Sequence, residues 1–161
     1  MKVVFLDIDG VLNNDKTTEQ VKIDGGNYTG LDARLVMMFR LWLDERPDVK
    51  VVLSSTWRKY KDAVQAIEAA PIPLWDMTRE LKTMRGREVA MWLRDHVNEV
   101  DAWAILDDVD GFLTYQRSHW VKTDPRVGLS QSDLDELDVI LGTSKSSGER
   151  SEGDASNEAE K

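Results

Sequence analysis

Two groups of aspartates form the most chemically suggestive pattern in the sequence. Each group begins where a short apolar run ends. The aspartates are Asp7, Asp9, Asp107, Asp108 and Asp110. Like charges that converge repel one another and need a cation between them. Oxygen ligands with no histidine or cysteine nearby suit a hard ion, and Mg²⁺ is the natural candidate.

Carboxylates around such an ion are suited to phosphoryl transfer. The carboxylate of Asp7 can attack phosphorus and form an aspartyl-phosphate, while the ion neutralises the charge that develops on the phosphate. Asp9 can protonate the leaving oxygen and later activate water. We therefore predict Asp7 as the nucleophile and Asp9 as the acid and base. The predicted metal ligands are Asp7, Asp9, Asp107 and Asp108. Whether Asp107 or Asp108 binds the ion directly stays open, as does the role of Asp110.

The chain around Asp9 must leave regular strand geometry. Alternate residues of a strand point to opposite faces, so Asp7 and Asp9 reach one phosphate only if the backbone bends between them. Gly10 supplies the permissive backbone that such a bend needs, and we expect it beside the substrate. The alternatives for this segment are a helix cap, a turn or an EF-hand loop, although Val11 stands where an EF-hand needs a third ligand.

A hydroxyl group is predicted at the end of the next apolar run. Ser54 directly follows residues 51–53 and is expected to hold a phosphate oxygen, with Ser55 and Thr56 as its alternatives. Ser55 and Arg58 are expected to contribute to substrate binding. The alternative for Arg58 is a solvated surface base.

A cation is predicted at the start of a helix. Arg85 opens the helical segment before the run 102–106, from where it can reach the strand ends and stabilise the charge of nucleophile and phosphate. Lys82 and Arg87 are its competitors for this role. Arginine does not deprotonate in proteins, so the role of Arg85 is electrostatic.

The elements that must position these residues alternate between strands and helices. Apolar runs predict strands at 3–6, 49–53, 102–106 and 120–122, with a proline-containing edge strand at 71–75. Helical spacing predicts helices at 31–44, 58–70, 86–97 and 132–141. The alternation indicates an α/β fold, a three-layer Rossmann-like parallel sheet with helices on both faces. Ligands of such sheets bind beyond the carboxyl ends of the strands, where the aspartates lie.

The domain organisation follows from composition. A chain of 161 residues predicts one domain, at residues 1–142. The segment 143–161 has almost nothing apolar and is predicted to be a disordered acidic tail. Residues 13–30 are polar and are expected to form a short flap, in the form of a small hairpin, over the site. This segment is too short for a large cap domain.

Four ordered motifs resemble those of the haloacid dehalogenase (HAD) superfamily. They are Asp7-Ile8-Asp9-Gly10-Val11-Leu12, Ser54, Arg85 and Asp107-Asp108. In that superfamily the first Asp is the nucleophile and the Asp two positions later is the acid and base. A Ser or Thr binds phosphate, a Lys or Arg stabilises it, and the final acids hold Mg²⁺. The third motif is more often Lys, so Arg85 is a departure. The resemblance covers residues 2–141 and implies a HAD-type fold and a phosphatase.

Three further segments are similar to the small HAD domains of Swiss-Army-Knife RNA repair proteins and related phage proteins. They are Leu53-Ser54-Ser55-Thr56-Trp57-Arg58, Arg85-Gly86-Arg87-Glu88-Val89, and Lys122-Thr123-Asp124-Pro125 with Gly128-Leu129. This resemblance implies action on nucleic-acid end phosphates or nucleotides.

Charge and composition limit the kinds of partner and cellular location that we expect for the protein. A formal net charge of -9 excludes a general nucleic-acid coat protein, because the phosphate backbone is repelled on average. The chain has no cysteine, which excludes disulfides and thiolate metal sites and fits a cytoplasmic location. No apolar stretch is long enough to span a membrane, and no signal peptide is expected. The sequence identifies no stable protein partner.

These patterns predict a Mg²⁺-dependent phosphomonoester hydrolase that acts through an aspartyl-phosphate at Asp7. Two rival hypotheses remain. One is a catalytically silent module that binds a phosphorylated ligand, and the other is a HAD phosphotransferase whose acceptor is not water.

Overall fold

A five-stranded parallel sheet forms the centre of the protein, and its strand order is β5-β4-β1-β6-β7. The computed structural model describes residues 1–144. The strands are β1 (Lys2–Leu6), β4 (Val49–Leu53), β5 (Leu74–Met77), β6 (Ala102–Asp107) and β7 (Trp120–Lys122). Leu6, the last residue of β1, lies beside Leu53 and Leu106 in the sheet. The residues that follow these three strands therefore emerge together at one edge.

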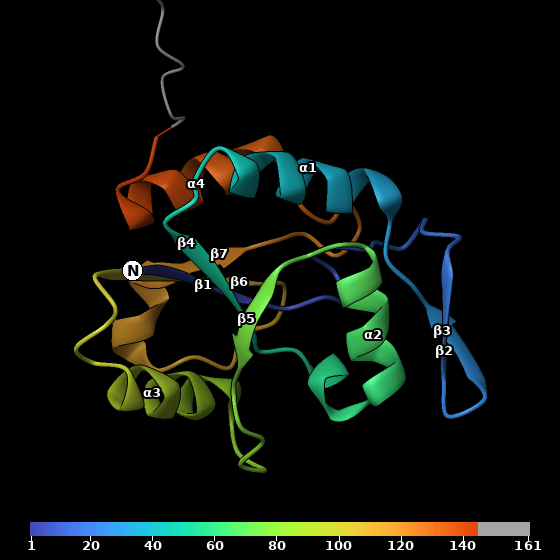
Figure 1. Cartoon of the computed structure of the whole chain (residues 1–161), viewed down its shortest axis with the longest axis horizontal. Coiled ribbons are helices and arrows are strands. Elements are labelled where there is room, and N and C mark those ends of the chain that lie inside the picture. The colour runs from blue at the N-terminus through green and yellow to red at the C-terminus, as the bar shows by residue number, and fades with distance from the viewer. Residues whose placement is uncertain (145–161) are drawn as a thin grey trace, which may run out of the picture.

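Helices cover both faces of this sheet (Figure 1). They are α1 (Ala33–Asp44), α2 (Lys61–Ala69), α3 (Arg85–Asp95) and α4 (Gln131–Leu141). Alternate side chains of β1 divide between two buried clusters. Val4 and Leu6 pack with α1, α4 and the buried side of α2, whereas Val3 and Phe5 pack with α3. Burial on both sides explains why the sequence of β1 is continuously apolar.

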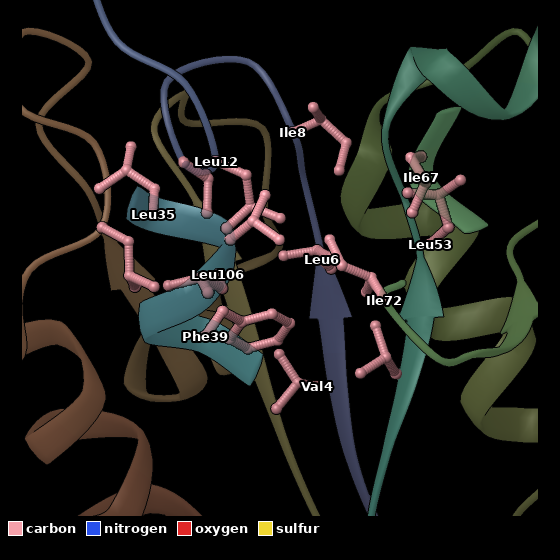
Figure 2. Close-up of a cluster of buried hydrophobic side chains, with 14 of the residues drawn as sticks. Val4, Leu6, Ile8, Leu12, Leu35, Phe39, Leu53, Ile67, Ile72 and Leu106 are labelled. Atoms are coloured by element: carbon pink, nitrogen blue, oxygen red, sulfur yellow. The ribbon is translucent and has the colours of Figure 1, made fainter. Parts of the chain in front are cut away.

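The turn after β1 is anchored in the larger of these clusters. Ile8 and Leu12 are fully buried and belong to the same cluster as Leu6 (Figure 2). The backbone N–H of Leu12 donates to the carbonyl of Ile8 at 2.9 Å, which closes a tight turn. The apolar side chains of the turn thus fix the backbone that carries Asp7 and Asp9.

A β-hairpin projects beside α2 (Figure 1). Its strands are β2 (Gln20–Ile23) and β3 (Gly26–Thr29). Asp24 and Gly25 form the two-residue loop, with φ angles of 51° and 80°. Both values suit a type I′ turn, for which Asp-Gly is a favoured pair. Val21 and Ile23 are buried, and β2 contacts α2.

The predicted α/β architecture is confirmed, and the flap is the hairpin. Two boundaries differ from the prediction by three residues, and the others differ by two or fewer. A 3₁₀ turn, η1 (Thr56–Lys59), precedes α2, so the helix expected from residue 58 begins at Lys61. The edge strand begins at Leu74, after both prolines, because proline cannot donate to the sheet.

The remaining expectations concern the ends of the chain and its insertions. The helix α4 ends at Leu141, and Gly142 caps it in the left-handed region. The segment 145–161, which holds most of the predicted tail, lies outside the described residues. Between residues 1 and 144 no large cap domain is present. None of the helices described is both long and apolar enough to cross a membrane.

Candidate active site

Three carboxylates converge at the carboxyl edge of the sheet. Asp7 follows β1, Asp107 ends β6, and Asp108 comes next. One oxygen from each of the three lies within 4.8 Å of the others. The guanidinium of Arg85, at the first residue of α3, joins them: its Nη1 lies 3.3 Å from Asp7 Oδ1 and is paired with Asp107 Oδ2. We call Asp7, Asp107, Asp108 and Arg85 the strand-end cluster.

Burial raises the pKa values of the three aspartates in the strand-end cluster. Burial raises the pKa of Asp7 to about 6, and the nearby Asp107 charge adds to the rise while Arg85 opposes it. Burial also raises the pKa of Asp107 and raises that of Asp108 to about 6, with the Asp7 charge contributing to the latter. For Arg85 burial lowers the pKa, but Asp7 and Asp107 more than offset it and the net shift is upward. Carboxylates in this state favour a bound cation.

Gly10 leaves room for the third carboxylate of the cluster. It has a φ of 77°, and a Cβ built on it would lie 2.3 Å from Asp108 Oδ2. Any other residue would therefore be strained by its backbone and would displace Asp108. The hydroxyl of Thr123, after β7, donates to the Gly10 carbonyl at 2.7 Å and fixes this backbone.

Asp9 stands apart from the strand-end cluster. It is exposed, and its carboxylate accepts from the amide of Asn13 at 2.9 Å and from the indole N–H of Trp57 at 3.1 Å. Asn13 is itself buried, donates to the Gly30 carbonyl and accepts from the Gly10 N–H. The structure thus aims the Asp9 side chain by two donors and does not place it among the three convergent carboxylates.

The three hydroxyls after β4 differ in exposure. Ser54 and Ser55 are fully buried, whereas Thr56 is exposed. Among the described residues the Ser54 hydroxyl has no hydrogen-bond partner. The Ser55 hydroxyl faces Asp7, whose pKa it helps to lower, and also accepts from the N–H of Trp57 at 3.2 Å. The predicted choice of Ser54 for the phosphate therefore has rivals in Ser55, beside Asp7, and Thr56, in the open.

Arg58 is held inside the site rather than at its opening. Its side chain is 6% exposed, and its Nη2 pairs with Glu88 of α3 at 2.7 Å. Its Nη1 donates to the carbonyls of Ser54 and Ser55 at 2.9 and 2.8 Å. Glu88 also accepts from the N–H of Leu81. These bonds tie the segment after β4 to α3, which carries Arg85. Arg58 also lines the groove that contains Asp7, and its role in substrate binding stays a prediction.

The other candidate bases lie further out. Lys82 and Arg87 are both exposed, and neither forms an ion pair with another of the residues described. The structure thus brings Arg85, and neither of its competitors, to Asp7 and Asp107. Asp110 pairs with Arg117 at 2.7 Å, and this bond holds its pKa below the usual range.

Two grooves open beside the strand-end cluster, and Asp9, Thr56 and Asp108 line both of them. The first, the hairpin groove, has a volume of about 1040 Å³ and runs toward β2 and β3. The second, the basic groove, has a volume of about 530 Å³ and contains Asp7 and Arg85. Its other basic residues are Arg58, Lys59 and Lys82. Acidic residues line it as well: Asp7, Asp9, Glu80, Glu88, Asp108 and Asp110.

Comparison with known families agrees with this geometry. Residues 3–134 match the family described as the HAD domain in Swiss Army Knife RNA repair proteins. The chain belongs to this HAD family. Neither a search of curated proteins nor a search of solved structures gave a match. Membership supports a phosphatase-type function in general and implies a phosphorylated substrate.

The donor set of this HAD domain fits a hard divalent cation. Three carboxylates supply only oxygen atoms, which are the ligands that Mg²⁺ prefers. Their raised pKa values indicate that the surrounding residues do not fully stabilise their charge, and a cation between them would do so.

Sequence reasoning missed some residues that shape this HAD site. Asn13, Thr123 and Glu88 are buried polar residues that hold the site's backbone and side chains. No sequence pattern indicates the bond from the Trp57 indole to Asp9. Thr123 lies in a segment that was quoted for its resemblance, yet no spacing rule connects it with Gly10, more than a hundred residues away.

Proposed function

We propose that this HAD domain is a Mg²⁺-dependent phosphomonoester hydrolase that works through an aspartyl-phosphate on Asp7. We further propose that it acts on nucleic-acid end phosphates or nucleotides. The family description, which refers to RNA repair proteins, supports this substrate class.

The observation that carries the proposal is the position of Asp7. Its carboxylate is buried at a sheet edge, touches one arginine and two further carboxylates, and still lines the basic groove. A buried acid that only stabilised the fold would need a partner but no access to solvent. Asp7 has a charged partner, Arg85, and also lines an open groove, which is the arrangement expected of a nucleophile.

The reaction would use groups already in place. A phosphate monoester in the basic groove would meet the guanidinium of Arg85, which stabilises its charge. An oxygen of Asp7 attacks phosphorus, and Asp9, aimed by Trp57 and Asn13, gives a proton to the leaving oxygen. Asp9 then takes a proton from the water that breaks the aspartyl-phosphate. Asp7, Asp107 and Asp108 would hold Mg²⁺, which would neutralise charge at the phosphate.

The direct test is phosphate release from a generic aryl phosphate in the presence of Mg²⁺. We expect turnover by the unaltered chain and none by the Asp7→Asn variant. Full activity of Asp7→Asn would overturn the assignment of the nucleophile. Absence of turnover by the unaltered chain on aryl phosphates, nucleotides and phosphorylated oligonucleotides, together with tight binding of one of them, would favour the silent binding module. Addition of a competing alcohol, with analysis of its phosphorylated product, separates hydrolysis from transfer.

A further inference from the structure

The hairpin groove begins where a leaving group would emerge from the proposed site. Asp7 and Arg85 line only the basic groove, whereas Asp9, the proposed proton donor, lines both. A phosphate seated against Arg85 with its ester oxygen toward Asp9 would therefore direct the alcohol part of the substrate into the hairpin groove. This inference rests on the proposed function.

Two tyrosines line the hairpin groove with exposed rings. Tyr28, in β3, is 57% exposed, and Tyr60, at the start of α2, is 42% exposed. Tyr28 pairs directly with Val21 across the hairpin, and directly opposed residues lie on the same face. Val21 is buried, so Tyr28 stands on the face of the hairpin that is turned toward the domain. An aromatic ring on that face that remains mostly exposed is not explained by packing.

The other residues that line the hairpin groove restrict the charge of a ligand that could bind beside these rings. The groove contains Asp15 and Asp24 in addition to Asp9 and Asp108, and no lysine or arginine of the described chain lines it. A second phosphate in this groove would be repelled. Thr29 and Thr56 are exposed in the same lining and offer hydroxyls to a polar ligand. The lining thus suits an uncharged group that combines a flat ring with hydroxyls.

We propose that the hairpin groove binds the nucleoside part of a nucleotide monoester, with its base against Tyr28 and Tyr60. Bases stack on aromatic side chains without strong preference among them, and each stack contributes substantially to affinity. The acidic lining selects a mononucleotide over a nucleoside that carries a second phosphate. Of the two proposed substrate classes, it therefore favours nucleotides over nucleic-acid ends, whose terminal nucleoside carries a phosphodiester as well. The hairpin is then the specificity element of the domain, and the strand-end cluster is indifferent to the base.

The test compares substrates that differ only in the base. Initial rates with Mg²⁺ would be measured for adenosine monophosphate and for ribose phosphate. The variants are Tyr28→Leu with Tyr60→Leu, which keep apolar bulk but lose the aromatic faces, and Tyr28→Phe with Tyr60→Phe, which keep the rings. Tyr115→Leu is the matched control, because Tyr115 is equally exposed at 58% but lines neither groove.

We expect the double leucine variant to raise KM for adenosine monophosphate by about tenfold, with kcat little changed. KM for ribose phosphate should stay the same, and the phenylalanine variants and Tyr115→Leu should match the unaltered chain. We also expect adenosine bisphosphate to be a poorer substrate than the monophosphate. Equal KM values for adenosine monophosphate and ribose phosphate in the unaltered chain would overturn the proposal, as would a tyrosine-dependent KM for phosphotyrosine but not for the nucleotide.

A binding measurement separates this inference from the proposed function. Calorimetry of Asp7→Asn with Mg²⁺ and adenosine monophosphate needs no turnover. Binding that weakens about tenfold in the double leucine background supports the nucleoside site even if no phosphatase activity is found. Binding that does not change in that background rejects the site even if aryl phosphates are hydrolysed.

Discussion

The strand-end cluster and the hairpin groove are built in opposite ways. The cluster lies where β1 and β6 end in register, and its Asp7 and Asp107 are buried and paired with Arg85. The hairpin joins the domain mainly through β2 and α2, and Tyr28 remains exposed. Central strands fix the position of a side chain far better than an inserted hairpin does. In the proposed function, the sheet therefore sets the chemistry, and the inserted hairpin selects the substrate.

Removal of the proposed nucleophile should have the largest effect on activity of all the changes considered. Asp7→Asn is expected to lower kcat for an aryl phosphate by a thousandfold or more, on the order of other nucleophile deletions. Its fold should remain intact, since the replaced carboxylate is one that burial and Asp107 disfavour in its charged form. Steady-state kinetics and circular dichroism would measure the two effects. The matched control is Asp135→Asn, an exposed position on α4, which should keep full activity.

Two glycines with similar positive φ angles allow the strand-end cluster and the hairpin to be compared. Gly10 in the cluster and Gly25 at the hairpin tip have φ angles of 77° and 80°. A Cβ at Gly10 would collide with Asp108, whereas one at Gly25 would meet nothing within 4 Å. Alanine at either position should cost about 1 kcal/mol of stability, but only Gly10→Ala should lose about a hundredfold in activity through displacement of Asp108.

Denaturant unfolding and aryl phosphate kinetics on both variants would check this. If Gly25→Ala lost as much activity as Gly10→Ala, backbone strain rather than the contact with Asp108 would be the cause. Isothermal titration with Mg²⁺ should also show weaker binding for Gly10→Ala alone.

The buried ion pair between Arg58 and Glu88 joins the segment after β4 to α3, the helix that carries Arg85. Glu88→Gln would leave the Arg58 charge buried without its partner, which is expected to cost about 3 kcal/mol of unfolding free energy. Because Arg58 also holds the carbonyls of Ser54 and Ser55, kcat should fall as well. On the same helix, Asp95→Asn removes an exposed pair with Arg94 and should change neither quantity measurably. A fully stable Glu88→Gln variant would contradict this role.

The smallest expected effect is the pH dependence of the metal-free protein. Asp7 and Asp108 have a pKa of about 6 when folded, against an ordinary value of 3.8, so the folded state binds more protons between these values. The unfolding free energy should therefore fall as pH rises from about 4 to about 6 and level off above. Asp138, whose pKa the bonds from Arg46 and Thr143 lower despite its burial, contributes in the opposite direction and only at lower pH.

Thermal unfolding measures this effect. Without metal, we expect Tm to be a few degrees lower at about pH 7 than at about pH 5. Mg²⁺ should restore it at neutral pH, and Asp108→Asn should flatten the dependence. A metal-free Tm that rises steadily from about pH 5 to about pH 7 would show that the aspartates are not held as the structure indicates.

The sequence was sufficient to predict the sheet and the edge that carries the site. Asp7, Ser54 and Asp107 each follow an apolar run, and parallel strands bring their ends together whatever the details of packing. The Asp24-Gly25 pair between two short polar strands likewise favours a hairpin. Arg85 could be placed because a residue at a helix start faces the same edge.

Side-chain geometry within that edge could not be predicted. Arg58 looks like a surface base in the sequence, but it pairs with Glu88 of a helix thirty residues away. The bond from Trp57 to Asp9 depends on the 3₁₀ turn η1, which no periodicity signals. The difference in exposure among Ser54, Ser55 and Thr56 arises from the same turn.

The central claim is that Asp7 carries the phosphoryl group during turnover. The Asp9→Asn variant should form the aspartyl-phosphate slowly and break it down more slowly still, because it lacks the group that activates water. Acid quenching during turnover with Mg²⁺ and an aryl phosphate, followed by mass spectrometry of peptides, is expected to find one phosphoryl group on the peptide that contains Asp7. A phosphoryl group on any other residue, or substrate hydrolysis by Asp7→Asn at the rate of the unaltered chain, would contradict the account.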